Sequence, residues 1–163
     1  MTLHSGYRLR RLLFLVVAGL SFSGVNAQVQ EKHAAGQWPA YSGDLGSTRY
    51  SPLDQIDAAN VGDLRIAWRW SAANFGPEPE FYYRVTPLMV DGVLYVTAGS
   101  RRNVVAIEAA PGETLWTHRV DEGERGAVAP RVNSGRGVAY WELSDGSERI
   151  YYITPGFQLL SLD

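Results

Sequence analysis

The sequence predicts an all-β protein, and three observations support this fold class. Short runs of β-branched and aromatic residues alternate with turn residues from residue 82 onward. Aromatic residues make up 12% of the chain and glycine contributes 17 residues, which suits short strands and tight turns better than long helices. A strand pattern near Tyr95 also recurs near Tyr152. These features predict small sheets built as repeats.

The first 27 residues are typical of a secretory signal peptide. Three arginines within residues 8–11 precede an apolar run at 12–20, and small residues at 25–27 suit a cleavage site. The apolar run is short for a stable membrane span, although an uncleaved signal anchor is the alternative. We therefore expect a periplasmic or secreted mature chain that begins with a flexible stretch at 28–36.

Charge and cysteine content exclude several classes of function. The formal net charge is −2, so nothing indicates binding to nucleic acid or to an anionic membrane surface. The chain contains no cysteine, which excludes disulfides, cysteine-ligated zinc, a Cys-x-x-Cys-His haem site and a cysteine-linked lipid anchor within it.

A leading segment, residues 37–81, differs in character from the strand-rich region after it. It begins with many turn residues, and "SPLDQI" and "NVGDL" predict short helical turns, the second capped by Asp57 or Asn60. The stretch 64–70 alternates as a strand does, and 71–81 is expected to be a loop because prolines interrupt it.

The region 82–163 predicts two groups of strands. Turn signals, including Asp91-Gly92, separate four strands of a predicted antiparallel meander, at 83–90, 93–98, 104–109 and 114–120. A long polar loop at 121–137 comes next. Three further strands are expected at 138–143, 149–154 and 157–163.

The second group repeats the first. The run 95–97 resembles 152–154, and 106–108 resembles 161–163, roughly 55 residues later in each case. A four-stranded unit with such a period indicates a β-propeller, and the alternative is a small β-sandwich with chance similarity. One full unit and most of a second do not close a ring, so we expect an incomplete propeller from the N-terminal part of a longer protein.

The motifs resemble those of quinoprotein dehydrogenases, eight-bladed propellers that use pyrroloquinoline quinone (PQQ). Ala106, Gly112 and Trp116 fit the spacing of that family's tryptophan-docking motif, in which a tryptophan of one blade packs on the backbone of the next. Glu108 and Pro111 depart from the usual Asp and Thr. The segments "WPAYSGD", "STRYSPLDQI", "NVGDLRIAW", "VTPLMVDGVLYV" and "GRGVAYW" occur in the family's order and extend the resemblance over roughly residues 37–163.

The resemblance implies that two arginines contact PQQ. Arg136 matches an arginine that pairs with a PQQ carboxylate, where a planar cation is needed, although it is otherwise an ordinary loop cation. Arg84 stands where many relatives carry a glutamate that touches the quinone, so it either binds a PQQ carboxylate differently or is a strand-edge cation. Pro130-Arg131 falls near the place where alcohol-oxidising relatives carry a cysteine pair that stacks on the quinone, which makes Arg131 a candidate to cover the ring. The missing pair disfavours the methanol-type subgroup and favours glucose-like sugars as substrates.

Other polar residues are expected to be structural. We predict an Asp44–Arg49 pair, an exposed Arg101-Arg102 turn, surface positions for His33 and His118, and solvated Glu122 and Glu124. Trp141 and the pair Tyr151-Tyr152 are expected to pack in the core or between blades. The family's calcium ligands and catalytic aspartate match no position here, so no catalytic or metal-binding residue is assigned and the fragment alone is expected to be inactive.

The sequence thus predicts the signal peptide (1–27), a flexible stretch (28–36), the leading segment (37–81) and the first propeller blades (82–163) of a periplasmic PQQ-dependent dehydrogenase. Such an enzyme would oxidise a sugar or alcohol with PQQ and calcium, and pass electrons to a quinone or cytochrome. The alternative is a non-enzymatic propeller that acts as a scaffold in envelope protein assembly.

Overall fold

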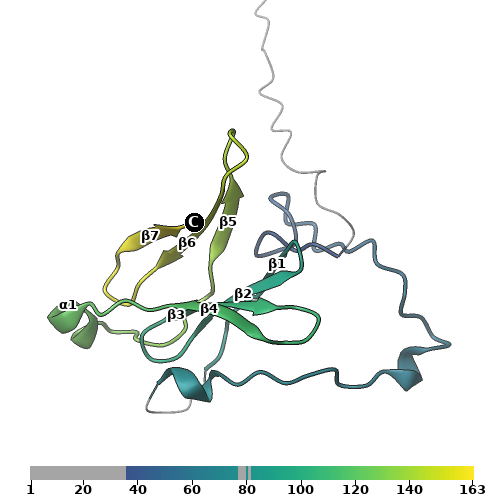
Figure 1. Cartoon of the computed structure of the whole chain (residues 1–163), viewed down its shortest axis with the longest axis horizontal. Coiled ribbons are helices and arrows are strands. Elements are labelled where there is room, and N and C mark those ends of the chain that lie inside the picture. The colour runs from purple at the N-terminus through teal and green to yellow at the C-terminus, as the bar shows by residue number, and fades with distance from the viewer. Residues whose placement is uncertain (1–35, 77–79, 81) are drawn as a thin grey trace, which may run out of the picture.

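The computed structural model describes residues 36–76, 80 and 82–163, which form two antiparallel sheets (Figure 1). The first sheet has the order β1-β2-β3-β4 and the second the order β5-β6-β7. The seven strands are β1 (Leu88–Val90), β2 (Val93–Ala98), β3 (Asn103–Glu108), β4 (Thr114–His118), β5 (Ala139–Glu142), β6 (Glu148–Ile153) and β7 (Leu159–Leu162). The all-β prediction and both strand groups are confirmed, while the predicted signal peptide lies outside the described residues.

The first sheet is a meander, as its turns predict. Asp91 and Gly92 have φ angles of 47° and 83°, the left-handed pair that a tight two-residue hairpin requires. Trp38 extends the sheet beyond β1, because its N–H donates to the Met89 carbonyl at 2.8 Å and its carbonyl accepts from Met89 N–H at 3.0 Å. The leading segment is therefore joined to the edge of the first sheet.

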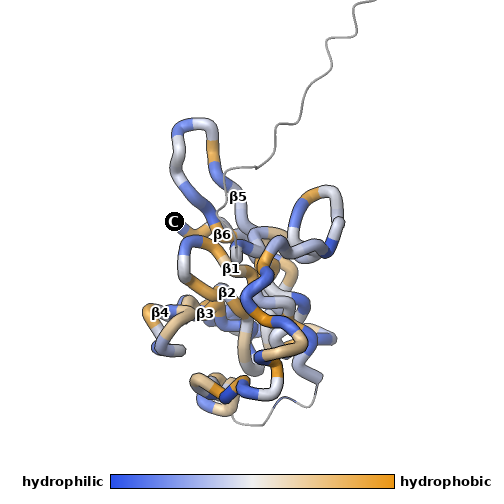
Figure 2. The backbone as a smooth tube through the Cα atoms, turned by 90° about the vertical axis from the view of Figure 1, so that its right-hand side faces the viewer, coloured by the Kyte–Doolittle hydropathy of each residue, from blue (hydrophilic) through white to orange (hydrophobic). Residues whose placement is uncertain are grey.

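The main core lies between the two sheets. Leu88, Val90 and Val104 of the first sheet pack in one buried cluster with Tyr140, Ile150 and Tyr152 of the second. Figure 2 shows apolar residues concentrated along β1, β2 and β3. His118 also lies here, since its ring meets the Tyr152 ring edge-on at 5.9 Å, so its predicted surface position is wrong.

A second cluster covers the opposite face of the first sheet. Val96, Ala98, Val105 and Ile107 are buried, and partly buried side chains that precede the sheet in the chain pack on them: Trp68, Trp70, Ala72, Phe75 and Val85. The first sheet is therefore sandwiched between the second sheet and the tryptophans of the leading segment.

Trp116, the tryptophan of the predicted docking motif, is exposed, and its ring lies 6.0 Å from that of Tyr95. Trp68, outside the motif, packs on the motif's glycine instead. Its indole lies so close to the β3–β4 turn that a Cβ on Gly112 would be 2.3 Å from Trp68 Cδ2, and its Nε1 donates to the Ala109 carbonyl at 3.0 Å. Trp70 Nε1 donates to Thr114 Oγ1 at 3.1 Å. The predicted strand at 64–70 is absent from the described structure, because these residues are held by side chains and pair with no strand there.

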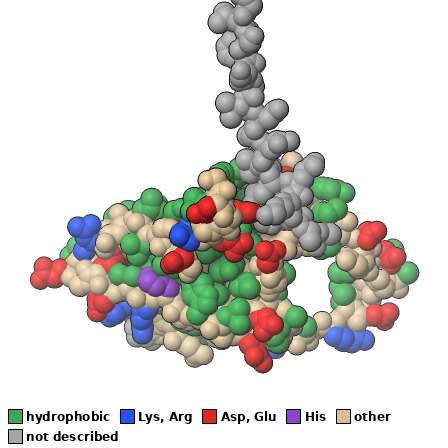
Figure 3. Space-filling view, turned by 45° about the horizontal axis from the view of Figure 1, so that its top comes forward, with side chains coloured by type: hydrophobic (Ala, Val, Ile, Leu, Met, Phe, Trp, Pro, Cys, Tyr) green, Lys and Arg blue, Asp and Glu red, His purple; other side chains and the backbone are tan. Residues whose placement is uncertain are grey.

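The middle of the leading segment forms an arc away from the sheets (Figure 1), and the space-filling view shows an opening between arc and body (Figure 3). A 3₁₀ helix at Val61–Asp63 confirms the predicted second turn, and Asp57 Oδ1 accepts the N–H groups of Ala59 and Asn60 before it. The arc exposes several large apolar side chains: Leu45, Tyr50, Leu53, Ile56, Val61, Leu64 and Ile66.

Several other predictions are corrected. Asp44 does not pair with Arg49; its carboxylate accepts from the Thr48 N–H at 3.0 Å and from Thr48 Oγ1 at 2.5 Å. The predicted loop 121–137 contains a short helix, α1 (Gly123–Ala127). A 3₁₀ helix at Ala72–Phe75, capped by the Ser71 side chain, interrupts the predicted loop 71–81. No helix among the described residues is long and apolar enough to cross a membrane.

Candidate functional site

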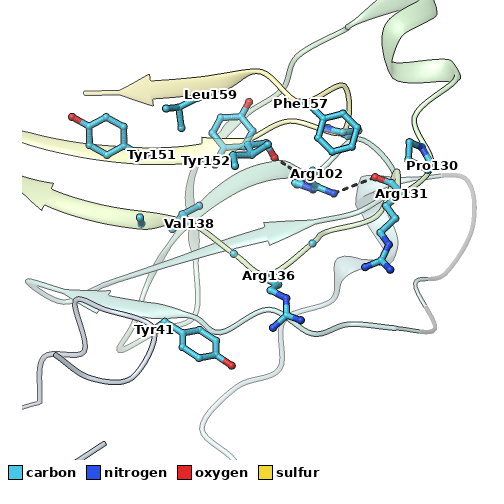
Figure 4. A pocket seen from close by; sticks show the side chains of 15 residues that line it. Tyr41, Arg102, Pro130, Arg131, Arg136, Val138, Tyr151, Tyr152, Phe157 and Leu159 are labelled. Atoms are coloured by element: carbon cyan, nitrogen blue, oxygen red, sulfur yellow. Dashed lines mark hydrogen bonds between the residues drawn. The ribbon is translucent and has the colours of Figure 1, made fainter. Parts of the chain in front are cut away.

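Two adjoining cavities lie beside residues 130–137, which we call the arginine loop. One cavity has a volume of about 760 Å³ and the other about 560 Å³, and the residues that border both are Arg102, Pro130, Arg131, Gly135 and Arg136. The larger cavity is otherwise mainly apolar, with Val138, Tyr152, Phe157 and Leu159 in its wall (Figure 4). The smaller cavity is polar, since Glu80, Tyr82 and Arg84 also line it.

Two glycines let the arginine loop pass close to its neighbours. Gly135 has a φ of 74°, and a Cβ there would lie 2.7 Å from Arg102 Nε. Gly137 has a φ of 109°, and a Cβ there would lie 3.0 Å from the Thr86 carbonyl oxygen. Because only glycine fits both the backbone angle and the space, "GRG" holds the Arg136 backbone tightly against the sheet.

Arg102 fixes the backbone of this loop from the β2–β3 turn. Its Nε donates to the Asn133 carbonyl at 3.0 Å and its Nη2 to the Arg131 carbonyl at 3.1 Å. Its Nη1 reaches the second sheet, donating to the Ile153 carbonyl at 2.8 Å. The prediction of an exposed Arg101-Arg102 turn is therefore wrong for Arg102, whereas Arg101 is exposed and pairs with Asp121 at 3.4 Å.

Ser134 is anchored through its amide, its hydroxyl and its carbonyl. Its N–H donates to Glu80 Oε1 at 3.0 Å, and its hydroxyl donates to the same oxygen. Its carbonyl accepts from Thr97 Oγ1 at 2.5 Å, and the residue is fully buried. Together with Arg102, these groups hold the middle of the arginine loop from two other segments of the chain.

Three guanidinium groups at the cavities are free to bind a ligand. The side chains of Arg84, Arg131 and Arg136 form no hydrogen bond or ion pair within the described part of the chain, although Arg84 stacks on the Tyr82 ring at 4.9 Å. Figure 4 shows Arg131 and Arg136 extending from the loop to the same side. Planar, unpaired guanidinium groups are suited to bidentate contacts with carboxylates.

Burial and neighbouring charges shift two pKa values near the smaller cavity. Burial lowers the pKa of Arg102, and the nearby carboxylates of Glu122 and Glu80 oppose this effect. Burial, assisted by the negative charge of Glu80, raises the pKa of Tyr83 to about 12, so this phenol stays protonated at neutral pH. Four guanidinium groups and one carboxylate line the smaller cavity, so its lining is mainly cationic.

Both predicted cofactor contacts, Arg84 and Arg136, line the smaller cavity, and Arg131 borders both cavities. Sequence reasoning missed Arg102, Glu80 and Ser134 as parts of this site. The glycines on either side of Arg136 were a usable signal, because paired glycines often mark close backbone approach. Nothing in the sequence indicated that Glu80 would accept hydrogen bonds from Ser134.

Comparison with known proteins settles the family. Residues 38–163 match the model of a PQQ family that is described as "glucose/ethanol/alcohol dehydrogenase, beta-propeller domain". The chain belongs to this quinoprotein family. The predicted resemblance and the propeller assignment are thereby confirmed.

Named relatives agree with this assignment. The dehydrogenase subunit of a quinone alcohol dehydrogenase from Gluconobacter oxydans is 36% identical over 78% of this chain and 16% of its own length. Quinohemoprotein alcohol dehydrogenase ADH IIB of Pseudomonas putida is 34% identical over 93% of this chain and 20% of its own. The chain therefore spans about a fifth or less of these relatives.

Solved structures give the same result. Quinohemoprotein alcohol dehydrogenase from Comamonas testosteroni matches with a TM-score of 0.51 and 34% identity, over 74% of this chain and 18% of that one. A europium-containing methanol dehydrogenase matches with a TM-score of 0.57 and 26% identity, over 80% of this chain and 21% of that one.

The unpaired arginines of the smaller cavity fit the family's cofactor, whereas the described residues offer no metal site. PQQ is a planar tricarboxylate, and three unpaired guanidinium groups beside two close-packed glycines form a matching cationic wall. Within the described ranges, no group of three or more His, Asp or Glu residues could hold a metal ion. No calcium ligand is therefore assigned in this part of the chain.

Proposed function

We propose that the chain is the cofactor-binding N-terminal part of a periplasmic PQQ-dependent dehydrogenase that oxidises an alcohol or sugar hydroxyl. The observation that carries this proposal is the set of unpaired guanidinium groups of Arg84, Arg131 and Arg136 around one cavity. The predicted signal peptide supports the periplasmic location.

These arginines hold the cofactor and contribute no proton transfer. PQQ, when bound, supplies a quinone that accepts hydride from the substrate carbon. Arg136, whose backbone is fixed by Gly135 and Gly137, binds one carboxylate, while Arg84 replaces an acidic residue of many relatives and binds a second one. Arg131 lies where a ring-covering group is expected, and its flat guanidinium suits that role.

The substrate and electron acceptor are proposed from the relatives and from the missing cysteines. The named relatives are alcohol dehydrogenases, and one from Thauera butanivorans is described as a 1-butanol dehydrogenase with cytochrome c. These names support an alcohol substrate and a cytochrome or quinone acceptor. The absence of a cysteine pair at Pro130-Arg131 supports a sugar as the other substrate class.

Binding of PQQ to the full-length protein tests the proposal. We expect Arg136→Ala to weaken PQQ binding on the order of ten- to a hundredfold, because a charge-assisted contact is lost, and Arg136→Lys to weaken it less. Arg65→Ala, which removes an exposed arginine of the arc, is the control and is expected to bind like the parent.

Titration by tryptophan fluorescence or equilibrium dialysis gives these affinities directly. A parent protein that binds no PQQ, in the presence or absence of calcium, would contradict the proposal. That result would favour the non-enzymatic scaffold instead, since a scaffold propeller needs no cofactor.

A further inference from the structure

We infer that Glu80 is a positioning residue that holds the arginine loop, residues 130–137, in its ligand-binding conformation. The inference rests on the proposed function for the identity of the ligand, but the contacts that carry it belong to this chain alone. Glu80 precedes the first sheet, whereas the loop precedes the second, so the contact joins residues 54 positions apart in the chain.

Glu80 uses its carboxylate to bind a backbone amide. One oxygen, Oε1, accepts both the N–H and the hydroxyl of Ser134. The side chain lines the same cavity as Arg84, Arg102, Arg131 and Arg136, yet it forms no ion pair with any of these described arginines. The carboxylate therefore hydrogen-bonds to Ser134 of the loop and contacts none of these cations directly.

Ser134 is well placed to transmit this contact to the ligand-binding arginines. It lies two residues before Arg136 and three after Arg131, and it is fully buried. Glu80 on its N–H and Thr97 on its carbonyl fix the backbone on both sides of the residue. Without Glu80, a buried N–H and hydroxyl lose their acceptor, which is costly enough to make the backbone turn or the loop loosen.

Glu80 has two opposite effects on the affinity of the cavity for an anionic ligand. Its negative charge opposes binding of carboxylates to the cavity, since like charges at close range repel. Its hydrogen bonds to Ser134 favour binding by keeping Arg131 and Arg136 in place. The other oxygen, Oε2, is buried and has no hydrogen-bond partner among the described residues, so it adds nothing to the second effect.

Two substitutions at this position separate the effects. Glu80→Gln removes the charge but keeps an amide oxygen to accept from Ser134. Glu80→Ala removes both. If Glu80 acts by position, Glu80→Gln binds PQQ at least as tightly as the parent, and Glu80→Ala binds it more weakly, on the order of tenfold.

The experiment uses the full-length protein and two readouts. Equilibrium dialysis measures the affinity for PQQ, and hydrogen exchange of the PQQ-free protein measures the order of residues 130–137. We expect faster exchange in this loop for Glu80→Ala than for the parent or Glu80→Gln. Glu124→Ala, which removes an exposed carboxylate on α1, is the matched control and should change neither readout.

The outcomes distinguish this inference from the proposed function. Tighter PQQ binding by both Glu80 variants, or unchanged loop exchange in Glu80→Ala, overturns the positioning role. A parent that binds no PQQ overturns the proposed function, while the exchange measurement still decides whether Glu80 orders the loop. A thermal unfolding midpoint that stays near the parental value shows that any loss in Glu80→Ala is local.

Discussion

At the scale of single residues, charged side chains were the hardest to place from sequence. Arg102 and Glu122 lie in stretches that predict solvated loops, yet each binds backbone groups of a distant segment. Glu122 accepts from Thr154 Oγ1 at 2.5 Å, from Gln158 Nε2 at 2.9 Å and from Gly156 N–H at 2.8 Å. No local pattern encodes such partners, because any backbone carbonyl or amide can serve.

Glu122 gives a prediction about pH. Burial raises the pKa of this carboxyl, but the three hydrogen bonds outweigh burial and leave the pKa below its ordinary value of 4.5. A lowered folded-state pKa means that the stabilisation is complete above that ordinary value and is lost as pH falls through the folded-state pKa.

We therefore expect the parent to lose more unfolding free energy than Glu122→Gln when pH falls from about 7 to about 3. At neutral pH, Glu122→Ala should cost about 1 kcal/mol through its lost hydrogen bonds. Urea unfolding at each pH measures both effects, with Glu124→Gln as the control. Parallel stability curves for the parent and Glu122→Gln would show that the carboxylate has no such role.

At the scale of elements, the strands could be predicted from the sequence, whereas the structure of the segments between and before the sheets could not. Alternating apolar residues and turns such as Asp91-Gly92 are local signals, so both strand groups were anticipated. The helix α1 was missed because its five residues include two glycines, which are poor helix formers. The stretch 64–70 has a strand pattern, but its tryptophans are used as docking groups on a sheet that is already complete.

The Trp68–Gly112 contact gives a prediction at this scale. Gly112→Ala adds a methyl group that meets the indole and also strains a φ of 78°, so it should destabilise the protein by about 3 kcal/mol. Gly92→Ala is the control, because its φ of 83° is equally strained but no atom lies within 4 Å of the added Cβ.

The control substitution should therefore cost only about 1 kcal/mol. Urea unfolding of both variants in the full-length protein measures the difference, which isolates the docking contact from backbone strain. Equal losses in the two variants would show that the indole moves aside without cost.

At the scale of the whole molecule, the two sheets and the segments before them together create the cationic wall. Arg84 comes from the stretch before β1, while Arg131 and Arg136 come from the loop before β5. Arg84 and Arg136 could be predicted only through the family resemblance, because spacing in the sequence does not reveal which loops meet. The packing of the sheets through Leu88 and Tyr152 brings them to one cavity.

The three unpaired arginines predict that the affinity for PQQ depends on salt concentration. Because Arg84, Arg131 and Arg136 line an open cavity, their attraction for a tricarboxylate is screened by added salt. We expect the affinity of the full-length protein for PQQ to fall steadily as sodium chloride is raised, with a shallower slope for Arg136→Ala. An affinity insensitive to salt would show that charge contributes little to binding.

The reach of Arg102 also bears on the order in which the chain folds during synthesis. Its guanidinium donates to the carbonyls of residues 131, 133, 153 and 154. Arg102 belongs to the first sheet, so the ribosome synthesises it before any of these acceptors. Chains emerge from the ribosome N-terminus first, and the first sheet is complete before these partners exist. The loop's own partners, Glu80, Thr97 and Arg102, precede it in the chain, so the arginine loop can be held as soon as it is made. Only the bonds from Arg102 Nη1 to the carbonyls of residues 153 and 154 wait for the second sheet.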